Sequence, residues 1–206
     1  MVKILFVCHG NICRSPMAEF VMKDLAMKRG YVVAGPRDAG AAEADFVIAS
    51  AATSTEELGN GVYPPAKRKL AAHGIGTAGN DLGVSRHRAH QITRAEYDAY
   101  DLVICMDENN LRNLKRGLRI PDAEWAAART ASDPAGNGMP RTGKSTPRTD
   151  ALPKVSLLLE YAPEEYLAGR SRWDGLEVAD PWYTGNFDAT WNDVVTGCQG
   201  LLDKLR

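Results

Sequence analysis

No stretch of the sequence approaches the roughly 20 consecutive apolar residues that a membrane-spanning helix needs. Neither sign of charge dominates, because 25 basic residues face 26 acidic ones and leave a net charge of −1. This balance argues against a general nucleic-acid binder and against a protein that coats a membrane surface. The first ten residues hold one lysine and a very short apolar run, which fits a strand better than a signal peptide.

Cysteine is also scarce, with four residues in a chain of 206. Since no export signal is recognised, we expect a cytoplasmic protein with reduced thiols rather than a disulfide framework. Cys8 and Cys13 could begin a metal site, but a structural zinc needs four ligands and no matching spacing follows. The cysteines are therefore expected to be reactive or simply buried, and neither a metal nor another cofactor is implied.

Four apolar segments predict buried strands, namely residues 3–7, 46–49, 101–106 and 155–159. Helical periodicity fills the gaps, most clearly over residues 17–29 and 191–202. This alternation predicts an α/β three-layer sandwich with a central four-stranded parallel sheet, in the flavodoxin-like order 2-1-3-4. We expect a single domain, residues 1–206, with loop insertions near residues 31–45, 76–83 and 119–152, where periodicity is lost.

The loop after the first strand holds the residues most suited to chemistry. Cys8 opens this loop, and Arg14 and Ser15 close it at the start of a predicted helix. Helix amino ends and loop amides attract anions, and the planar fork of an arginine fits two phosphate oxygens. A serine hydroxyl can also hydrogen-bond the sulfur and favour a reactive thiolate. The loop therefore predicts a phosphate site with Cys8 as nucleophile, although a buried, inert cysteine remains an alternative.

A proton donor for the leaving group is offered near the carboxyl terminus. Asp180 precedes Pro181, which disfavours helical backbone at Asp180 and lets its side chain project from a loop. Trp182 and Tyr183 follow and could wall a cleft for a flat ring. An ordinary surface turn is the competing interpretation, because Asp-Pro is common in turns.

Together, Cys8-x5-Arg14-Ser15 and Asp180-Pro181-Trp182-Tyr183 resemble the low-molecular-weight protein tyrosine phosphatase family. Residues 50–54, Ser-Ala-Ala-Thr-Ser, are similar to its Ser-Ala-Gly-Thr-Ser segment, with Ala52 in place of glycine. Further matching segments follow in the family's order at residues 58–60, 65–66, 74–75, 87–89 and 101–107. The resemblance covers most of the chain outside the three predicted insertions.

The resemblance implies a phosphoric monoester hydrolase in which Cys8 forms a cysteinyl-phosphate, Arg14 binds the phosphoryl group, and Asp180 acts as acid and then as base. It also implies a supporting hydrogen-bond network of Asn11, Ser15, Ser50 and His87, although His87 could instead be an ordinary surface histidine. The remaining loop residues are His9, Gly10, Ile12 and Cys13. In the family the thiol matched by Cys13 can bond to an oxidised nucleophile and shield it.

Two departures from the family affect the predicted substrate cleft. Glu56 stands where many members carry an aromatic residue, which favours basic residues near the phosphotyrosine. Trp182 replaces a tyrosine, so only Tyr183 remains of that pair. The expected partners are tyrosine-phosphorylated proteins, with no nucleic acid and no membrane insertion, and the chain is expected to be a monomer or a weak homodimer.

Three rival functions remain. A thioredoxin-coupled arsenate reductase needs two relay cysteines, but Cys105 and Cys198 both fall on predicted core positions. A protein-arginine phosphatase is the closer rival; those relatives carry threonine where this chain has Ile12, which would crowd a guanidinium and suit an aryl ester. A non-catalytic phosphotyrosine-binding module should have lost Cys8, Arg14 or Asp180, and all three are present.

Overall fold

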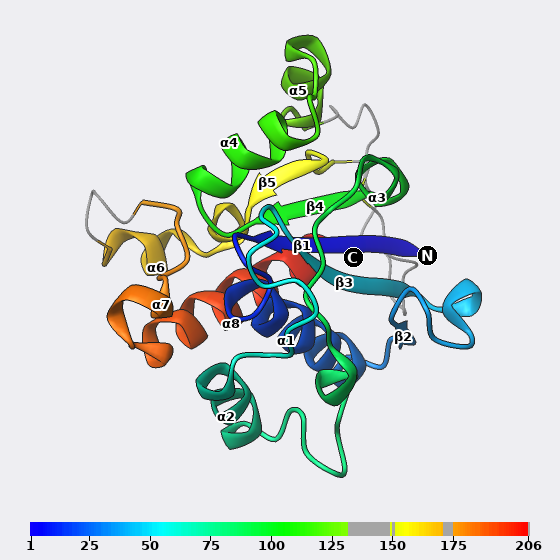
Figure 1. Cartoon of the computed structure of the whole chain (residues 1–206), viewed down its shortest axis with the longest axis vertical. Helices are drawn as coiled ribbons and strands as arrows, with labels where there is room; N and C mark the ends of the chain where they lie inside the picture. The colour runs from blue at the N-terminus through cyan, green and yellow to red at the C-terminus, as the bar shows by residue number, and fades with distance from the viewer. Residues whose placement is uncertain (132–148, 150, 171–174, 206) are drawn as a thin grey trace.

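A five-stranded parallel sheet forms the centre of the computed structural model, which describes residues 1–131, 149, 151–170 and 175–205 (Figure 1). The strands are β1 (Val2–Cys8), β2 (Val33–Ala34), β3 (Phe46–Ala52), β4 (Leu102–Cys105) and β5 (Val155–Leu157). They lie in the order β2-β3-β1-β4-β5, and every neighbouring pair is parallel. The order of the four predicted strands is confirmed, but their number is wrong, because β2 adds a fifth strand at the edge.

The missed strand β2 lies in residues 31–45, which the sequence analysis treats as a loose insertion. It has only two residues, and Val33 and Ala34 pair with Phe46 and Val47 of β3. An edge strand this short has too few residues to show a period. The prediction for β5 was too long, since the strand ends at Leu157 and the chain turns into a short 3-10 helix over Leu158–Tyr161.

Eight α-helices lie in the described part of the chain. They are α1 (Arg14–Lys28), α2 (Pro64–Ala72), α3 (Arg94–Ala99), α4 (Glu108–Gly117), α5 (Asp122–Ala128), α6 (Glu164–Ala168), α7 (Pro181–Thr184) and α8 (Phe187–Lys204). Short 3-10 turns also occur at Ala41–Glu43 and Val84–Arg86. Helix α5 falls within the predicted insertion at 119–152, of which residues 132–148 and 150 lie outside the described residues. Among the described helices, none is long and apolar enough to cross a membrane.

Successive side chains of β1 point to opposite faces of the sheet, and both faces are buried. Ile4 and Phe6 join the apolar core shared with α1 and α8, whereas Leu5 and Val7 join the core beneath α4. Figure 1 shows these helices on opposite sides of the sheet. Each fully buried side chain of this size stabilises the fold by roughly 1.5–3 kcal/mol relative to exposure.

Helix α8 packs unusually close to the turn that follows β5. A methyl group added at Gly200 would collide with the main-chain carbonyl of Tyr161. A glycine in the middle of a helix normally costs about 1 kcal/mol relative to alanine. Here the glycine permits the close approach of α8 to the turn that follows β5.

Candidate active site

The loop between β1 and α1 turns its carbonyl groups outward. The carbonyl oxygens of Cys8 and His9 accept hydrogen bonds from the main-chain N–H groups of Thr53 and Ser54, at 2.9 and 3.0 Å. Further along the loop, the Ile12 carbonyl accepts the N–H of Tyr63 at 2.9 Å. The neighbouring segments therefore fix the outer side of the loop through hydrogen bonds to its carbonyl oxygens.

This arrangement directs amide donors into the loop. In a planar trans peptide the N–H points opposite to the carbonyl, so outward carbonyls place the following N–H groups on the inner side. The N–H groups of Gly10, Ile12 and Cys13 have no acceptor within the described residues. Successive inward amides at the start of a helix form a concave site for an anion.

Asn11 gives the loop its sharp curvature. Its φ is +57°, the left-handed region that asparagine tolerates better than most residues. The side chain is fully buried, and its Nδ2 donates to the hydroxyl oxygens of Ser15 and Ser50 at 3.0 and 2.9 Å. Its backbone carbonyl accepts a hydrogen bond from His87 Nε2 at 2.8 Å. Because a carbonyl only accepts, the proton must be on Nε2 of His87.

His87 and Ser50 are in turn supported from α1. Ser50 donates to the carboxylate of Glu19 at 2.6 Å, and Glu19 is paired with Lys23 one helical turn later. Burial lowers the pKa of His87 by more than its hydrogen bond to Asn11 raises it, so the imidazole is neutral at physiological pH. A neutral imidazole suits a fixed hydrogen-bond donor, and these contacts favour a supporting role for His87 over that of an exposed surface histidine.

The sulfur of Cys8 lies at the mouth of this loop and accepts two hydrogen bonds. The Ser15 hydroxyl donates to it at 3.0 Å, and the N–H of Asn11 donates at 3.3 Å. Hydrogen bonds to a sulfur favour its anionic form, which is the nucleophilic form of a cysteine. The sulfur therefore lies where it would face a group held by the loop amides.

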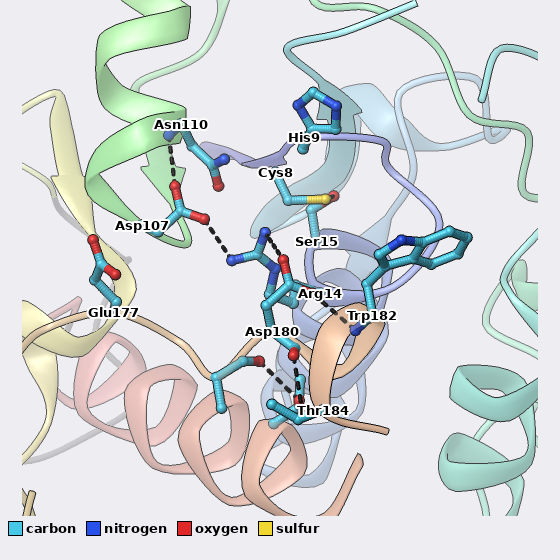
Figure 2. A network of polar contacts seen from close by, with 12 residues as sticks. Cys8, His9, Arg14, Ser15, Asp107, Asn110, Glu177, Asp180, Trp182 and Thr184 are labelled. Carbon is cyan, nitrogen blue, oxygen red and sulfur yellow. Dashed lines mark hydrogen bonds and ion pairs between the residues drawn. The ribbon is translucent and has the colours of Figure 1, made fainter. Parts of the chain in front are cut away.

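Arg14 supplies the fixed positive charge beside Cys8. Its guanidinium is 2.6 Å from Asp107 through Nη1 and 2.6 Å from Asp180 through Nη2 (Figure 2). Burial alone lowers the pKa of the guanidinium, but the negative groups around it, led by Cys8, outweigh this and raise the pKa. Asp107 also caps α4 by accepting the N–H of Asn110 at 2.6 Å, so the arginine is anchored to a helix start.

Cys13, the second cysteine of the loop, has a strongly perturbed thiol. Burial, followed by the nearby charges of Cys8 and Asp180, raises the pKa of its thiol to about 12. It packs in a small apolar cluster with Ile12 and Ala89. Cys105 and Cys198 are fully buried in the two cores, as predicted, and burial raises the pKa of both thiols.

The segment that carries Asp180 is held on both sides. Asp193 of α8 accepts the N–H of Ala179 at 2.8 Å and also contacts Tyr166 of α6 and Arg170, which follows that helix. Arg170 donates to the carbonyl of Glu177 at 2.6 Å. Asp180 itself caps α7, where its Oδ1 accepts the N–H of Trp182 at 3.0 Å and its Oδ2 remains on Arg14. The carboxylate therefore faces the loop from a rigid support.

A cleft of about 360 Å³ opens over Cys8. Its walls come from the loop, from α4 and from the start of α7 (Figure 2). Glu56 lies on the rim, with its carboxylate 3.0 Å from Nε2 of His9, whose side chain is exposed. Trp182 is 56% exposed, and the centroid of its ring lies 5.5 Å from that of Tyr63. Tyr183 is 86% exposed, so the rings of Trp182 and Tyr183 are both accessible to a ligand.

The structure brings the predicted catalytic, loop, supporting and cleft residues to one end of the sheet. The sequence placed Asp107 only at the end of the matching segment 101–107 and did not indicate its contact with Arg14. It also missed Glu19, Asn110, and Tyr166 and Arg170 behind Asp180. Asp107 could have been found, because it follows a buried strand adjacent to β1 and therefore lies at the same sheet edge as Cys8.

The fold and this site define a class: a parallel α/β protein whose first strand–loop–helix unit surrounds a thiol with inward amides and a fixed guanidinium. The family model described as "Low molecular weight phosphotyrosine protein phosphatase" matches residues 3–121. The phosphatase of that name from Gallus gallus is 32% identical over 207 residues, covering 98% of this chain and 94% of its own. The chain belongs to the low molecular weight phosphotyrosine protein phosphatase family.

Solved structures agree with this assignment. The crystal structure of YfkJ from Bacillus subtilis matches with a TM-score of 0.65 and 26% identity, covering 98% of this chain and 93% of that one. A crystallised Drosophila arginine phosphatase matches with a TM-score of 0.61 and 25% identity, covering 98% and 96%. The second likeness bears on the choice of substrate below.

Proposed function

We propose that the protein is a protein-tyrosine phosphatase that hydrolyses phosphotyrosine through a cysteinyl-phosphate on Cys8. The observation that carries this proposal is the geometry around its sulfur. Two donors stabilise a thiolate there, unpartnered loop amides lie next to it, and Arg14 is fixed alongside. Nucleophile, anion site and proton donor are thus within one cleft.

In the first step the Cys8 thiolate attacks the phosphorus while three phosphoryl oxygens rest on the loop amides and Arg14. The S–P bond forms as the bond to the phenolic oxygen breaks, and Asp180 gives its proton to that oxygen. An incoming phosphate dianion competes with Asp180 for Arg14.

In the second step water attacks the phosphorus of the cysteinyl-phosphate. Asp180, now ionised, accepts a proton from that water, the S–P bond breaks, and inorganic phosphate leaves with Cys8 restored as thiolate. Ser15 remains within hydrogen-bond reach of the sulfur and supports it as a leaving group. The inward amides stabilise the negative charge in both transition states.

The cleft walls support an aryl phosphate as substrate. Ile12 and the exposed ring of Trp182 supply apolar surface to a flat ring. Glu56 on the rim favours basic residues next to the phosphotyrosine. These features support tyrosine-phosphorylated proteins as the partners of this chain.

Protein-arginine phosphatase activity is the second candidate, because the chain is similar over its whole length to the Drosophila arginine phosphatase. The cleft contains carboxylates of Glu56 and Glu57 that could pair with a guanidinium. Ile12 weighs against it, since its branched side chain crowds the planar group at the loop.

Rates measured side by side on phosphotyrosine and phosphoarginine peptides of the same sequence decide between the two. The proposal predicts faster turnover of phosphotyrosine, with both activities absent in Cys8→Ser. Faster turnover of phosphoarginine would overturn the substrate assignment. Equal activity of wild type and Cys8→Ser would overturn the proposed mechanism as well.

A further inference from the structure

Two asparagine side chains extend the cleft away from the phosphate loop. Asn109 and Asn113 lie one turn apart on α4, and both line the cleft over Cys8. Figure 2 shows α4 on one side of Cys8 and Trp182 on the other. Side chains four positions apart on a helix share a face, with about 5–6 Å between their Cβ atoms.

Neighbouring arginines fix which way these carboxamides point. Arg112 donates to Oδ1 of Asn109 at 2.6 Å, and Arg116 donates to Oδ1 of Asn113 at 2.9 Å. A guanidinium has donors only, so the oxygen of each carboxamide must face it. Each Nδ2 group is left with its two donors, and neither has an acceptor in the described part of the chain.

We infer that Asn109 and Asn113 bind the main chain of an extended peptide that carries the phosphorylated side chain. In an extended chain, alternate residues present their carbonyls on the same side, about 6.6–6.8 Å apart. This matches two donors spaced by one helical turn once side-chain flexibility is allowed. The inference rests on the proposed function, and it identifies the substrate as a peptide segment rather than a small phosphate ester.

Acidic substrate side chains are the other acceptors that these donors could take. The charges of the cleft disfavour them, because four carboxylates line it: Glu56, Glu57, Asp107 and Asp180. Arg14 is the arginine among the lining residues, and it already faces two of these carboxylates. Arg112 and Arg116 are bound to the oxygens of the two carboxamides and do not line the cleft. A neutral carbonyl accepts the same hydrogen bonds without this repulsion.

The test compares two substrates in one double variant, Asn109→Ala with Asn113→Ala. The substrates are p-nitrophenyl phosphate and a phosphotyrosine peptide flanked by alanines, which offers main-chain acceptors only. We expect kcat/KM on the peptide to fall roughly tenfold and kcat/KM on p-nitrophenyl phosphate to change by less than about twofold. Gln199→Ala on α8 is the matched control, since Gln199 has an exposed carboxamide and lies outside this cleft; it should leave both values unchanged.

Two results would overturn the inference. One is an equal loss on both substrates, which would mean that the asparagines act on the phosphate site itself. The other is a loss seen only with peptides that carry aspartate or glutamate beside the phosphotyrosine, which would assign the donors to acidic side chains. Failure of the proposed function has a separate signature, namely p-nitrophenyl phosphate hydrolysis that does not depend on Cys8.

Discussion

The carboxylate of Asp180 lies 2.6 Å from the guanidinium of Arg14, so the proposed proton donor and the proposed phosphate binder are in direct contact. A phosphate that enters the loop must share or take over this contact. Where the phosphate takes this contact over, Asp180 is freed from its cation in the step in which it is proposed to give its proton.

Replacing Asp180 tests its role as acid through the leaving group. Asp180→Asn should lower kcat/KM on phenyl phosphate, which reports the step that expels the leaving group, by about 10²–10⁴-fold, because phenolate is a poor leaving group that needs the proton. The loss should be much smaller on p-nitrophenyl phosphate, whose leaving group is stable as an anion. Values of kcat/KM across a series of substituted phenyl phosphates measure this; an equal loss of kcat/KM on every member would remove Asp180 from the role of acid.

The contacts of Asp193 behind Asp180 should affect catalysis only by positioning Asp180. Asp193→Asn keeps the shape of the side chain but removes the charge that holds Arg170 and Tyr166. We expect kcat on phenyl phosphate to fall on the order of tenfold, since small misplacements of a catalytic group are costly. Tyr166→Phe removes one of these contacts and should have a smaller effect.

The same substitution made in an Asp180→Asn background separates positioning from folding. If Asp193 acts by positioning the acid, Asp193→Asn should then cause little further loss of kcat. An undiminished loss in that background would show a general structural effect. Thermal unfolding of both variants monitors whether the fold is retained.

His87 should make the stability of the protein depend on pH in the acid range. Its pKa is lowered in the folded state by burial, so the unfolded chain binds a proton first as the pH falls below about 6.5. Its contribution is complete above that value and is lost as the pH falls through the lowered folded-state pKa. His87→Gln lacks this titration.

Urea unfolding of wild type and His87→Gln between pH 8 and pH 5 measures the effect. The advantage in unfolding free energy of wild type over the variant should shrink towards pH 5. A difference that is constant, or that grows in acid, would contradict the lowered pKa of His87. The other histidines are common to both proteins and cancel in the comparison.

Cys13 should protect Cys8 from irreversible oxidation. Peroxide would oxidise the Cys8 thiolate to a sulfenic acid, and the Cys13 thiol would then displace water to form a disulfide. Wild type should regain activity with dithiothreitol after mild peroxide, whereas Cys13→Ser should regain much less. Mass spectrometry that finds no linked Cys8–Cys13 peptides in the wild type would sink this hypothesis.

The fold was largely predictable because its buried strands are short apolar runs separated by amphipathic helices. The phosphate loop was predictable as well, since its residues are close together in the sequence. What could not be predicted depends on long-range contacts between polar residues. The edge strand β2 has two residues, and the contacts of Asp193 with α6 join segments that carry no shared pattern.

Trapping of the phosphorylated enzyme tests the central claim most directly. Wild type is mixed rapidly with p-nitrophenyl phosphate, quenched at neutral pH and digested, and the peptides are analysed by mass spectrometry. Asp180→Ala is treated in parallel, since loss of the base slows hydrolysis of the intermediate. We predict phosphate on the sulfur of Cys8 in both proteins. Turnover with no phosphate on Cys8, or with phosphate on another residue, would contradict the account.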